Sequence, residues 1–189
     1  MSGSGGPWIF AYGSVIWRPS FPFASRHEAI VRGFSRRFWQ GSEDHRGVPG
    51  APGRVVTLVA EPAAICLGVA YRLAPADADE VLAHLDVREQ GGYGRATVAI
   101  EVRDHGVDSA ITYVAPPGNA LDLGDAPHEE IALQIADAVG PSGTNRDYLF
   151  ELARAVSELS HPALDADAIR RHDAHLFALD ARVRALTTP

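Results

Sequence analysis

The sequence predicts an α+β domain in which a mainly antiparallel sheet or barrel carries helices packed along its outside. Up to Pro117 the apolar residues follow strand-like patterns, and after Pro117 they recur at helical spacing. The chain shows no internal repeat, and its 189 residues suit one domain better than two. We therefore expect a single domain over residues 1–189, with the small and polar residues 1–6 flexible.

The first half of the chain is expected to supply the strands. Residues Trp8 to Tyr12 form a compact apolar run that ends at Gly13, which predicts a buried strand leading into a turn. The patterns predict further strands over residues 29–34, 36–40, 55–60, 65–73, 96–102 and 109–115. Residues 41–53 form a polar loop rich in glycine and proline, and ordered loops of this length are often functional.

The helices are expected mainly after Pro117. Pro127 and the acidic residues behind it begin a helix that Gly140-Pro141 ends. A second helix carries apolar residues at helical spacing from Tyr148 to Leu159, and a third extends from Asp167 to Leu186. A shorter helix-like run, Asp79 to Leu85, lies among the strands.

Composition excludes several classes of function. All 17 basic residues are arginine, and the chain therefore lacks the lysine that a pyridoxal-phosphate Schiff base, a lysine nucleophile or a Walker A loop requires. The net charge of −7 opposes nucleic-acid binding. No apolar run reaches the roughly 18 residues of a membrane helix, and no basic-then-apolar leader marks secretion. We expect a cytoplasmic protein with a small-molecule partner and no cofactor.

Glu89 is the candidate catalytic residue within the segment Ala83 to Tyr93. The helix-like run leads into it, and Gly91-Gly92 behind it permits the positive φ that ends a helix. A carboxylate fixed in this way suits acid/base work, but charged residues also precede Gly-Gly turns without a catalytic role. The local features leave both interpretations open.

The remaining motifs can each be interpreted in more than one way. The turn Tyr12-Gly13-Ser14 is either an anion cradle of backbone N–H groups or an ordinary strand end. His172 and His175 lie three apart, a spacing found both in metal sites and on solvated helix faces, and we expect no metal site. Asp86 with Glu89 stays open as a glycosidase-like pair of carboxylates. Cys66 lies in an apolar run and is expected to be a buried core residue.

A series of motifs spans nearly the whole chain in order. They are YGSVIW at residues 12–17, SRRFWQGS at 35–42, DHRG at 44–47, PGRVVTL at 52–58, LDVREQGGY at 85–93, GPSGTN at 140–145, YLFEL at 148–152 and HLFAL at 175–179. Together they resemble the ChaC family, which consists of glutathione-specific γ-glutamylcyclotransferases. Ala11 stands where that family usually has Gly, Val15 where it usually has Leu, and Gly94-Arg95 where Arg-Thr is more typical.

The resemblance implies a fold, a reaction and a site. The fold would be the γ-glutamylcyclotransferase-like small mixed β-barrel flanked by helices. The reaction would be intramolecular attack of the γ-glutamyl α-amine on the γ-amide carbonyl of reduced glutathione, giving 5-oxoproline and Cys-Gly, with Glu89 as general acid/base. The γ-glutamyl moiety would be bound by the first strand and its turn, that is Ile9, Phe10, Ala11, Tyr12, Gly13, Ser14 and Val15.

Further residues are expected to support this chemistry. A glutamate of ordinary pKa, about 4.3, is a poor base toward an ammonium, so Glu89 should be partly buried with a raised pKa. Tyr113 is expected to offer its hydroxyl to the substrate. Arg54 is expected to bind the Cys-Gly half, unless Arg36, Arg37 or Arg46 does so instead, and Glu80 either assists Glu89 or merely packs.

Two further functions stay open at this point. As alternatives to a glutathione-specific enzyme, the chain is a cyclotransferase for other γ-glutamyl amino acids or amines, or it is a non-catalytic binding module of the same fold, which the presence of Glu89 disfavours. The oligomeric state does not follow from the sequence.

Overall fold

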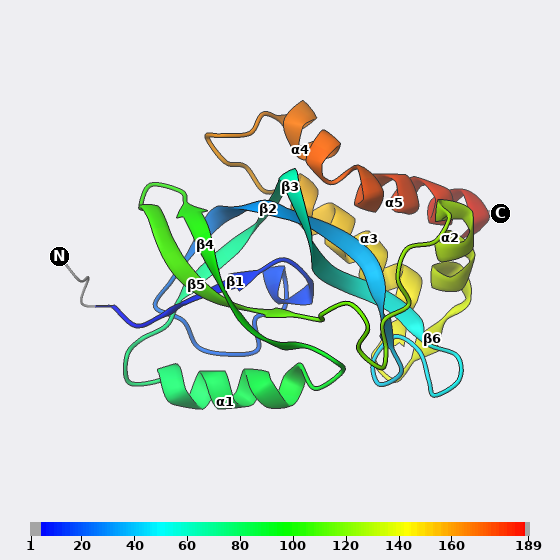
Figure 1. Cartoon of the computed structure of the whole chain (residues 1–189), viewed down its shortest axis with the longest axis horizontal. Coiled ribbons are helices and arrows are strands. Elements are labelled where there is room, and N and C mark those ends of the chain that lie inside the picture. The colour runs from blue at the N-terminus through cyan, green and yellow to red at the C-terminus, as the bar shows by residue number, and fades with distance from the viewer. Residues whose placement is uncertain (1–4, 188–189) are drawn as a thin grey trace.

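A closed barrel forms the centre of the computed structural model, which describes residues 5–187 (Figure 1). Its strands follow the order β1 (Trp8–Ala11), β3 (Gly53–Arg72), β2 (Ser25–Ser42), β4 (Gly94–Val102) and β5 (Gly106–Val114). Neighbouring strands are antiparallel, except that β1 and β5 are parallel and close the barrel. This mixed barrel with helices outside it confirms the predicted α+β class.

Strands β2 and β3 are longer than the sequence pattern predicted. The separate strands expected over 29–34 and 36–40 are parts of β2, and those expected over 55–60 and 65–73 are parts of β3. The β2–β3 register shifts between Arg32 and Phe34, where Gly33 has a φ of 81°. A glycine tolerates this left-handed backbone without steric cost, so the strand bends at a bulge instead of ending.

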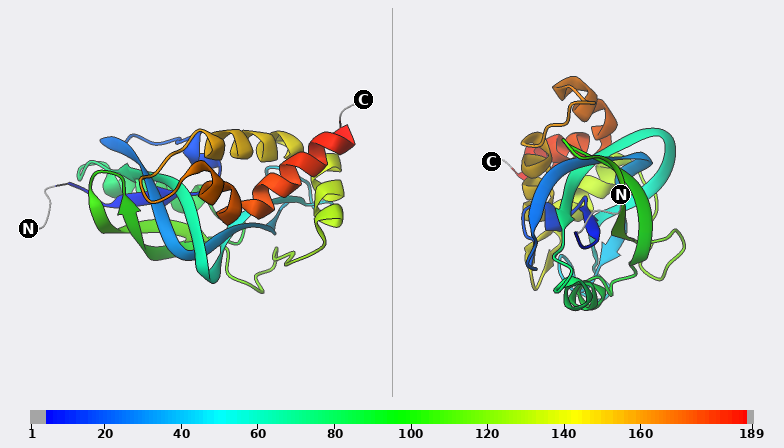
Figure 2. Two further views of the ribbon diagram at one scale, coloured as in Figure 1. Left: turned by 90° about the horizontal axis from the view of Figure 1, so that it is seen from above. Right: turned by 90° about the vertical axis from the view of Figure 1, so that its left-hand side faces the viewer.

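The helices form separate groups around the barrel (Figure 2). Helix α1 (Ala78–Arg88) packs alone on one side. Helices α2 (His128–Asp137), α3 (Asn145–Ser157), α4 (Ala166–His172) and α5 (Ala174–Thr187) gather elsewhere and contact β2 and β3. A short hairpin, β6 (Val139–Gly140) with β7 (Gly143–Thr144), precedes α3.

The prediction of a single C-terminal helix from Asp167 to Leu186 is wrong. It is broken at Asp173, whose φ of −103° and ψ of 28° end α4 before α5 begins. The carboxylate of Asp173 is buried in an ion pair with Arg36 of β2, and this long-range contact overrides the local helical pattern.

The core is shared by the barrel and the helices. Phe10, Leu67 and Tyr71 fill the barrel side, while Leu149 of α3 and Leu179 of α5 are fully buried beneath the helices. Full burial of such a side chain stabilises the fold by roughly 1.5–3 kcal/mol. None of the helices within residues 5–187 combines the length and apolar character that crossing a lipid bilayer requires.

The expected flexible start of the chain lies partly outside the described residues, which begin at Gly5. The carbonyl of Gly5 accepts a hydrogen bond from Arg72 (3.1 Å), and Gly6 lies against the backbone of Leu73.

Candidate active site

A cavity of about 480 Å³ opens where the end of β1, the end of α1 and the loop after β2 meet. It brings together most of the residues that the sequence and the resemblance singled out. Its lining includes Glu89, Tyr113 and the whole β1 segment with its turn, which is Ile9, Phe10, Ala11, Tyr12, Gly13, Ser14 and Val15.

Glu89 is fixed at the end of α1 by the turn that follows it. Its N–H donates to the carbonyl of Leu85 (2.9 Å), and Gly92 takes a φ of 91°. A side chain at Gly92 would collide with Gln40 and Asn119, each 2.6 Å from where its Cβ would lie. The amide of Gln40 donates to the carbonyl of Gly91 (2.8 Å) and bonds to Asn119. The Gly-Gly turn therefore holds Glu89 at a fixed position.

The environment of Glu89 favours its protonated form. Its side chain is 22% exposed, and burial raises the pKa of the carboxyl. The positive charge of Arg88, whose Nε lies 3.4 Å from Oε1, opposes this shift, and so does the neighbouring His45, while Asp44 adds to it. A raised pKa makes the carboxylate a better proton acceptor, as the sequence-based expectation required.

The turn after β1 presents unused backbone donors to the cavity. Residues Ser14–Ile16 form a short 3-10 helix preceded by Gly13. The N–H groups of Gly13, Ser14 and Val15 have no acceptor among the described residues, because the hydrogen bonds of this turn begin at the N–H of Ile16. Successive free N–H groups of this kind bind anions such as a carboxylate.

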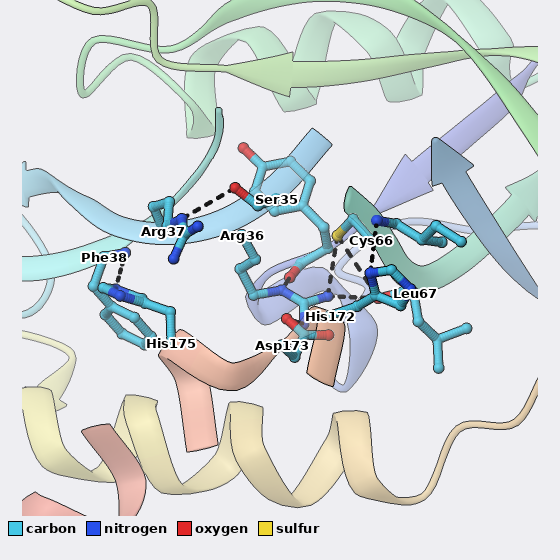
Figure 3. Close-up of polar contacts among 11 residues, drawn as sticks. Ser35, Arg36, Arg37, Phe38, Cys66, Leu67, His172, Asp173 and His175 are labelled. Carbon is cyan, nitrogen blue, oxygen red and sulfur yellow. Dashed lines mark hydrogen bonds and ion pairs between the residues drawn. The ribbon is translucent and has the colours of Figure 1, made fainter. Parts of the chain in front are cut away.

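Arg36 supports this turn from the buried side, and Figure 3 shows its side chain beside Leu67 and Asp173. Its guanidinium is fully buried and donates from Nε to the carbonyl of Tyr12 (2.7 Å), from Nη1 to Asp173 (2.7 Å) and from Nη2 to the carbonyl of Leu67 (2.5 Å). Arg36 thereby connects the cradle to β3 and to the break between α4 and α5.

Arg88 connects the turn that carries Glu89 to the cradle. Its Nη2 donates to the hydroxyl of Ser14 (3.0 Å), and its Nη1 donates to the hydroxyl of Ser20 (2.8 Å). The same guanidinium neighbours Glu89. The relative position of Glu89 and the cradle is therefore set by direct side-chain contacts.

Tyrosine hydroxyls surround the cavity. The hydroxyl of Tyr12 donates to the carbonyl of Tyr113 (2.6 Å), and that of Tyr93 donates to the carbonyl of Val56 (2.6 Å). Tyr113 donates its own proton to Asp86 (2.8 Å). Burial raises the pKa of each of these phenols, and those of Tyr113 and Tyr148 reach about 12. All of them stay protonated donors at neutral pH.

Arg54 does not line the cavity, contrary to the expectation that it meets the substrate. Its guanidinium is buried and donates to Gln134 (2.7 Å) and to the carbonyls of Phe38 and Gly124 (both 3.0 Å). The side chain points toward α2, so its hydrogen bonds stabilise the packing of that helix against the barrel.

Arg46 is the arginine of this region that lines the cavity. Its Nη1 donates to the carbonyl of Thr144 (3.1 Å), and its guanidinium lies 5.5 Å from the ring centre of Tyr148. Nε and Nη2 of Arg46 have no hydrogen-bond partner within residues 5–187 and remain available to a ligand. Arg36, by contrast, is fully buried in its ion pair, and Arg37 pairs with Glu61.

The loop that carries Arg46 rests directly on glycine backbone. A Cβ on Gly53 would lie 2.4 Å from the carbonyl oxygen of Arg46, and one on Gly140 would lie 2.4 Å from that of His45. These contacts are possible only without side chains. They bring the segments 44–47, 52–58 and 140–145 together although these are far apart in the sequence.

The remaining sequence candidates lie outside the cavity. Glu80 is exposed on α1, and Asp86 pairs with Arg95 instead of facing Glu89 as a second acid. His172 and His175 each accept a backbone N–H, from Ile65 (3.3 Å) and Phe38 (3.2 Å). Across the described residues, no group of three or more His, Cys, Asp or Glu side chains is arranged to hold a metal ion.

Sequence reasoning missed several cavity residues. Arg18, Arg88 and Tyr148 line it, yet none was expected to meet the substrate. Arg88 stands next to Glu89 in the motif LDVREQGGY, and Tyr148 begins YLFEL, so membership in these motifs was the available signal. The helical spacing of Tyr148 indicated only a core position.

A model of the family described as "ChaC-like protein" matches residues 7–186. The chain belongs to this family. It is 38% identical over 193 residues to a Danio rerio protein named glutathione-specific γ-glutamylcyclotransferase 1, covering 100% of the chain and 94% of the relative. The human protein of the same name is 45% identical over 150 residues, covering 77% of the chain and 68% of the relative.

The solved structures agree with this membership in the ChaC-like family. A crystal structure of a yeast γ-glutamyl cyclotransferase specific to glutathione superposes with a TM-score of 0.86 at 30% identity, covering 96% of each chain. The barrel and its helices therefore have the fold of that enzyme, as the resemblance implied.

Proposed function

We propose that the chain is a glutathione-specific γ-glutamylcyclotransferase in which Glu89 is the general acid/base. The observation that carries the proposal is the cavity in which a partly buried Glu89, of raised pKa, is joined through Arg88 to the Gly13–Val15 turn with its free N–H groups. A base and a carboxylate cradle fixed together are what the cyclisation of a γ-glutamyl amide needs.

The cradle residues bind the α-carboxylate of the γ-glutamyl group through the N–H groups of Gly13, Ser14 and Val15. Holding this end folds the substrate so that its α-amine approaches the γ-carbonyl, and such pre-positioning contributes up to roughly 7–11 kcal/mol to lowering a barrier. Glu89 accepts a proton from the amine and returns it to the leaving nitrogen of cysteine. The products are 5-oxoproline and Cys-Gly, with no water consumed.

The charge of the cavity supports glutathione over a neutral γ-glutamyl amine. Arg18, Arg46 and Arg88 line it against the carboxylates of Asp44 and Glu89. Glutathione carries a second carboxylate on its glycine, which a guanidinium can bind bidentately. Arg46, with Nε and Nη2 available, is the arginine we assign to it. Names of relatives that specify glutathione support the same substrate.

We also propose that the protein is cytoplasmic. Its single cysteine, Cys66, is a buried thiol with no disulfide partner, which suits a reducing compartment.

Incubation of the purified protein with reduced glutathione tests the function directly. Both 5-oxoproline and Cys-Gly should form in equal amounts, and Glu89→Gln should abolish their formation because the amide cannot carry the proton. Binding of glutathione, followed by calorimetry, should survive in this variant because the cradle is intact. If Glu89→Gln kept more than a few per cent of wild-type kcat, Glu89 would not be the acid/base.

A further inference from the structure

Tyr148 differs from the other tyrosines of the cavity in its hydrogen bonds. Tyr12, Tyr93 and Tyr113 each donate their hydroxyl proton to an oxygen of the protein. The hydroxyl of Tyr148 only accepts, from the N–H of Val56 at 3.5 Å, and its proton has no acceptor in the part of the chain that the structure describes. A buried donor without an acceptor is costly to keep unless a ligand completes it.

The ring of Tyr148 is held firmly beside the cradle. It is 6% exposed and packs against Trp17 and Phe38, with ring centres 5.8 and 6.1 Å away. The guanidinium of Arg46 covers it from another direction. Its hydroxyl lies 3.3 Å from the place of a Cβ on Gly13, so only glycine at that position leaves this space open. The hydroxyl is thus a fixed donor at the γ-glutamyl end of the cavity.

The cyclisation needs a donor that the proposed residues do not supply. When the α-amine nitrogen bonds to the γ-carbon, the carbonyl oxygen becomes an oxyanion. The cradle N–H groups are occupied by the α-carboxylate, and Glu89 is negative or carries the proton in transit. Stabilisation of such an oxyanion by a pre-positioned donor is commonly the largest single contribution to acyl transfer.

We propose that Tyr148 is a catalytic residue that donates a hydrogen bond to the γ-carbonyl oxygen as it becomes an oxyanion. This role rests on the proposed function. The bond from the α-nitrogen to the γ-carbon forms, the bond from that carbon to the cysteine nitrogen breaks, and the amine proton travels through Glu89 to the leaving nitrogen. Tyr148 keeps its own proton throughout.

Paired variants test this role with reduced glutathione as substrate. Tyr148→Phe should lower kcat by about a hundredfold, the usual effect of removing one oxyanion donor, while KM changes little. It should fold, because the ring stays and only a 3.5 Å contact is lost. Tyr93→Phe is the matched variant, since its hydroxyl donates to a buried carbonyl. Tyr93→Phe should lower Tm more than Tyr148→Phe, and should lower kcat less.

Measuring the binding of glutathione to an inactive variant separates contacts made in the ground state from contacts made only in the transition state. In Glu89→Gln, addition of Tyr148→Phe should leave the Kd of reduced glutathione nearly unchanged. The role of Tyr148 is overturned if Tyr148→Phe retains the wild-type kcat. A rise in KM and Kd at unchanged kcat would show that the hydroxyl binds the carboxylate of the substrate in the ground state. If the wild-type protein forms no 5-oxoproline, the proposed function itself fails and this role falls with it.

Discussion

At the scale of single residues, the site depends on charged groups held where water cannot fully solvate them. Glu89 is the clearest case, because burial raises its pKa despite the guanidinium of Arg88 beside it. Such a group is useful as a base but unfavourable for folding. The structure therefore predicts a conflict between activity and stability at this residue.

Glu89→Gln should consequently be more stable than the wild type at neutral pH. A carboxyl whose pKa is raised in the folded state contributes stability that is present below its unfolded pKa and is lost as the pH rises through the folded pKa. The neutral amide does not suffer this loss. Urea unfolding at pH 4 and pH 7.5 checks the prediction: the gain should be present at pH 7.5 and small at pH 4. A variant less stable than wild type at pH 7.5 would contradict it.

The second prediction at this scale concerns the proposed binding of the Cys-Gly half of glutathione by Arg46. Arg46→Ala should lower kcat/KM for glutathione by about ten- to a hundredfold, the value of a charge-assisted hydrogen bond of roughly 1.5–3 kcal/mol. It should affect γ-glutamyl-alanine less, because the carboxylate of that substrate lies elsewhere.

Arg54→Ala is the control, since its guanidinium bonds to Gln134 and backbone carbonyls outside the cavity. It should lower Tm and should leave the preference between the substrates unchanged. Equal losses for both substrates in Arg46→Ala would reject Arg46 as the source of selectivity.

At the scale of elements, the cradle is only as rigid as the strands and helices behind it. The end of β1 is followed by a turn whose carbonyl at Tyr12 is held by Arg36 of β2, and Arg36 is in turn held by Asp173 between α4 and α5. Oδ2 of Asp173 has no hydrogen-bond partner among the described residues, so this pair is not optimised for stability alone. A buried pair of this kind is weak evidence for stability and is better explained by positioning.

Replacement of both Arg36 and Asp173 separates the contribution of the pair to stability from its role in positioning the cradle. Arg36→Met alone should destabilise the protein by about 3–5 kcal/mol because Asp173 remains buried and unpaired. Arg36→Met with Asp173→Leu should recover much of that loss. Activity should not recover, because the Tyr12 carbonyl still lacks its donor and the cradle is no longer fixed. Chemical denaturation and kcat/KM are measured on both variants, and full activity in the double variant would show that Arg36 has no positioning role.

At the scale of the whole molecule, the C-terminal helices are fastened to the barrel through His175, which is neutral. Nε2 of His175 accepts the N–H of Phe38 (3.2 Å), so its Nδ1 carries the proton and donates to His128 (3.1 Å). Burial lowers the pKa of His175 to about 3, and the charge of Arg37 acts in the same direction. Strand β2 and helices α2 and α5 therefore meet at a contact that a proton would break.

Acid should for this reason unfold the protein as one unit. A depressed folded pKa contributes stability that is present above the unfolded pKa of about 6.5 and is lost as the pH falls toward the folded value. The free energy of unfolding should then fall by about 1.4 kcal/mol per pH unit. His175→Gln should be less stable than the wild type at pH 7. Its free energy of unfolding, measured by urea titration, should decline less steeply from pH 6.5 to pH 4.5.

Because we infer one domain, unfolding should give a single transition that coincides by fluorescence and circular dichroism. Separate transitions would contradict this prediction.

The sequence by itself determined what depends on neighbours along the chain. Alternating and helical apolar patterns predicted most elements, and the glycines behind Glu89 and after Tyr12 predicted the turns that bound the site. Turn chemistry and periodicity act within a few residues, so they can be read locally. The motif resemblance added the reaction and Glu89, and the family and fold it implied are confirmed. The roles of the individual site residues stay predictions.

Only the tertiary structure decided which side chains meet. Arg46 and Arg54 stand in the same stretch and look equivalent in the sequence, yet one faces the cavity and the other α2. The break at Asp173 depends on Arg36, which is 137 residues away. The direction of a side chain follows from strand register, bulges and helix docking, and these are set by long-range packing and by the cost of leaving a buried charge or donor without a partner.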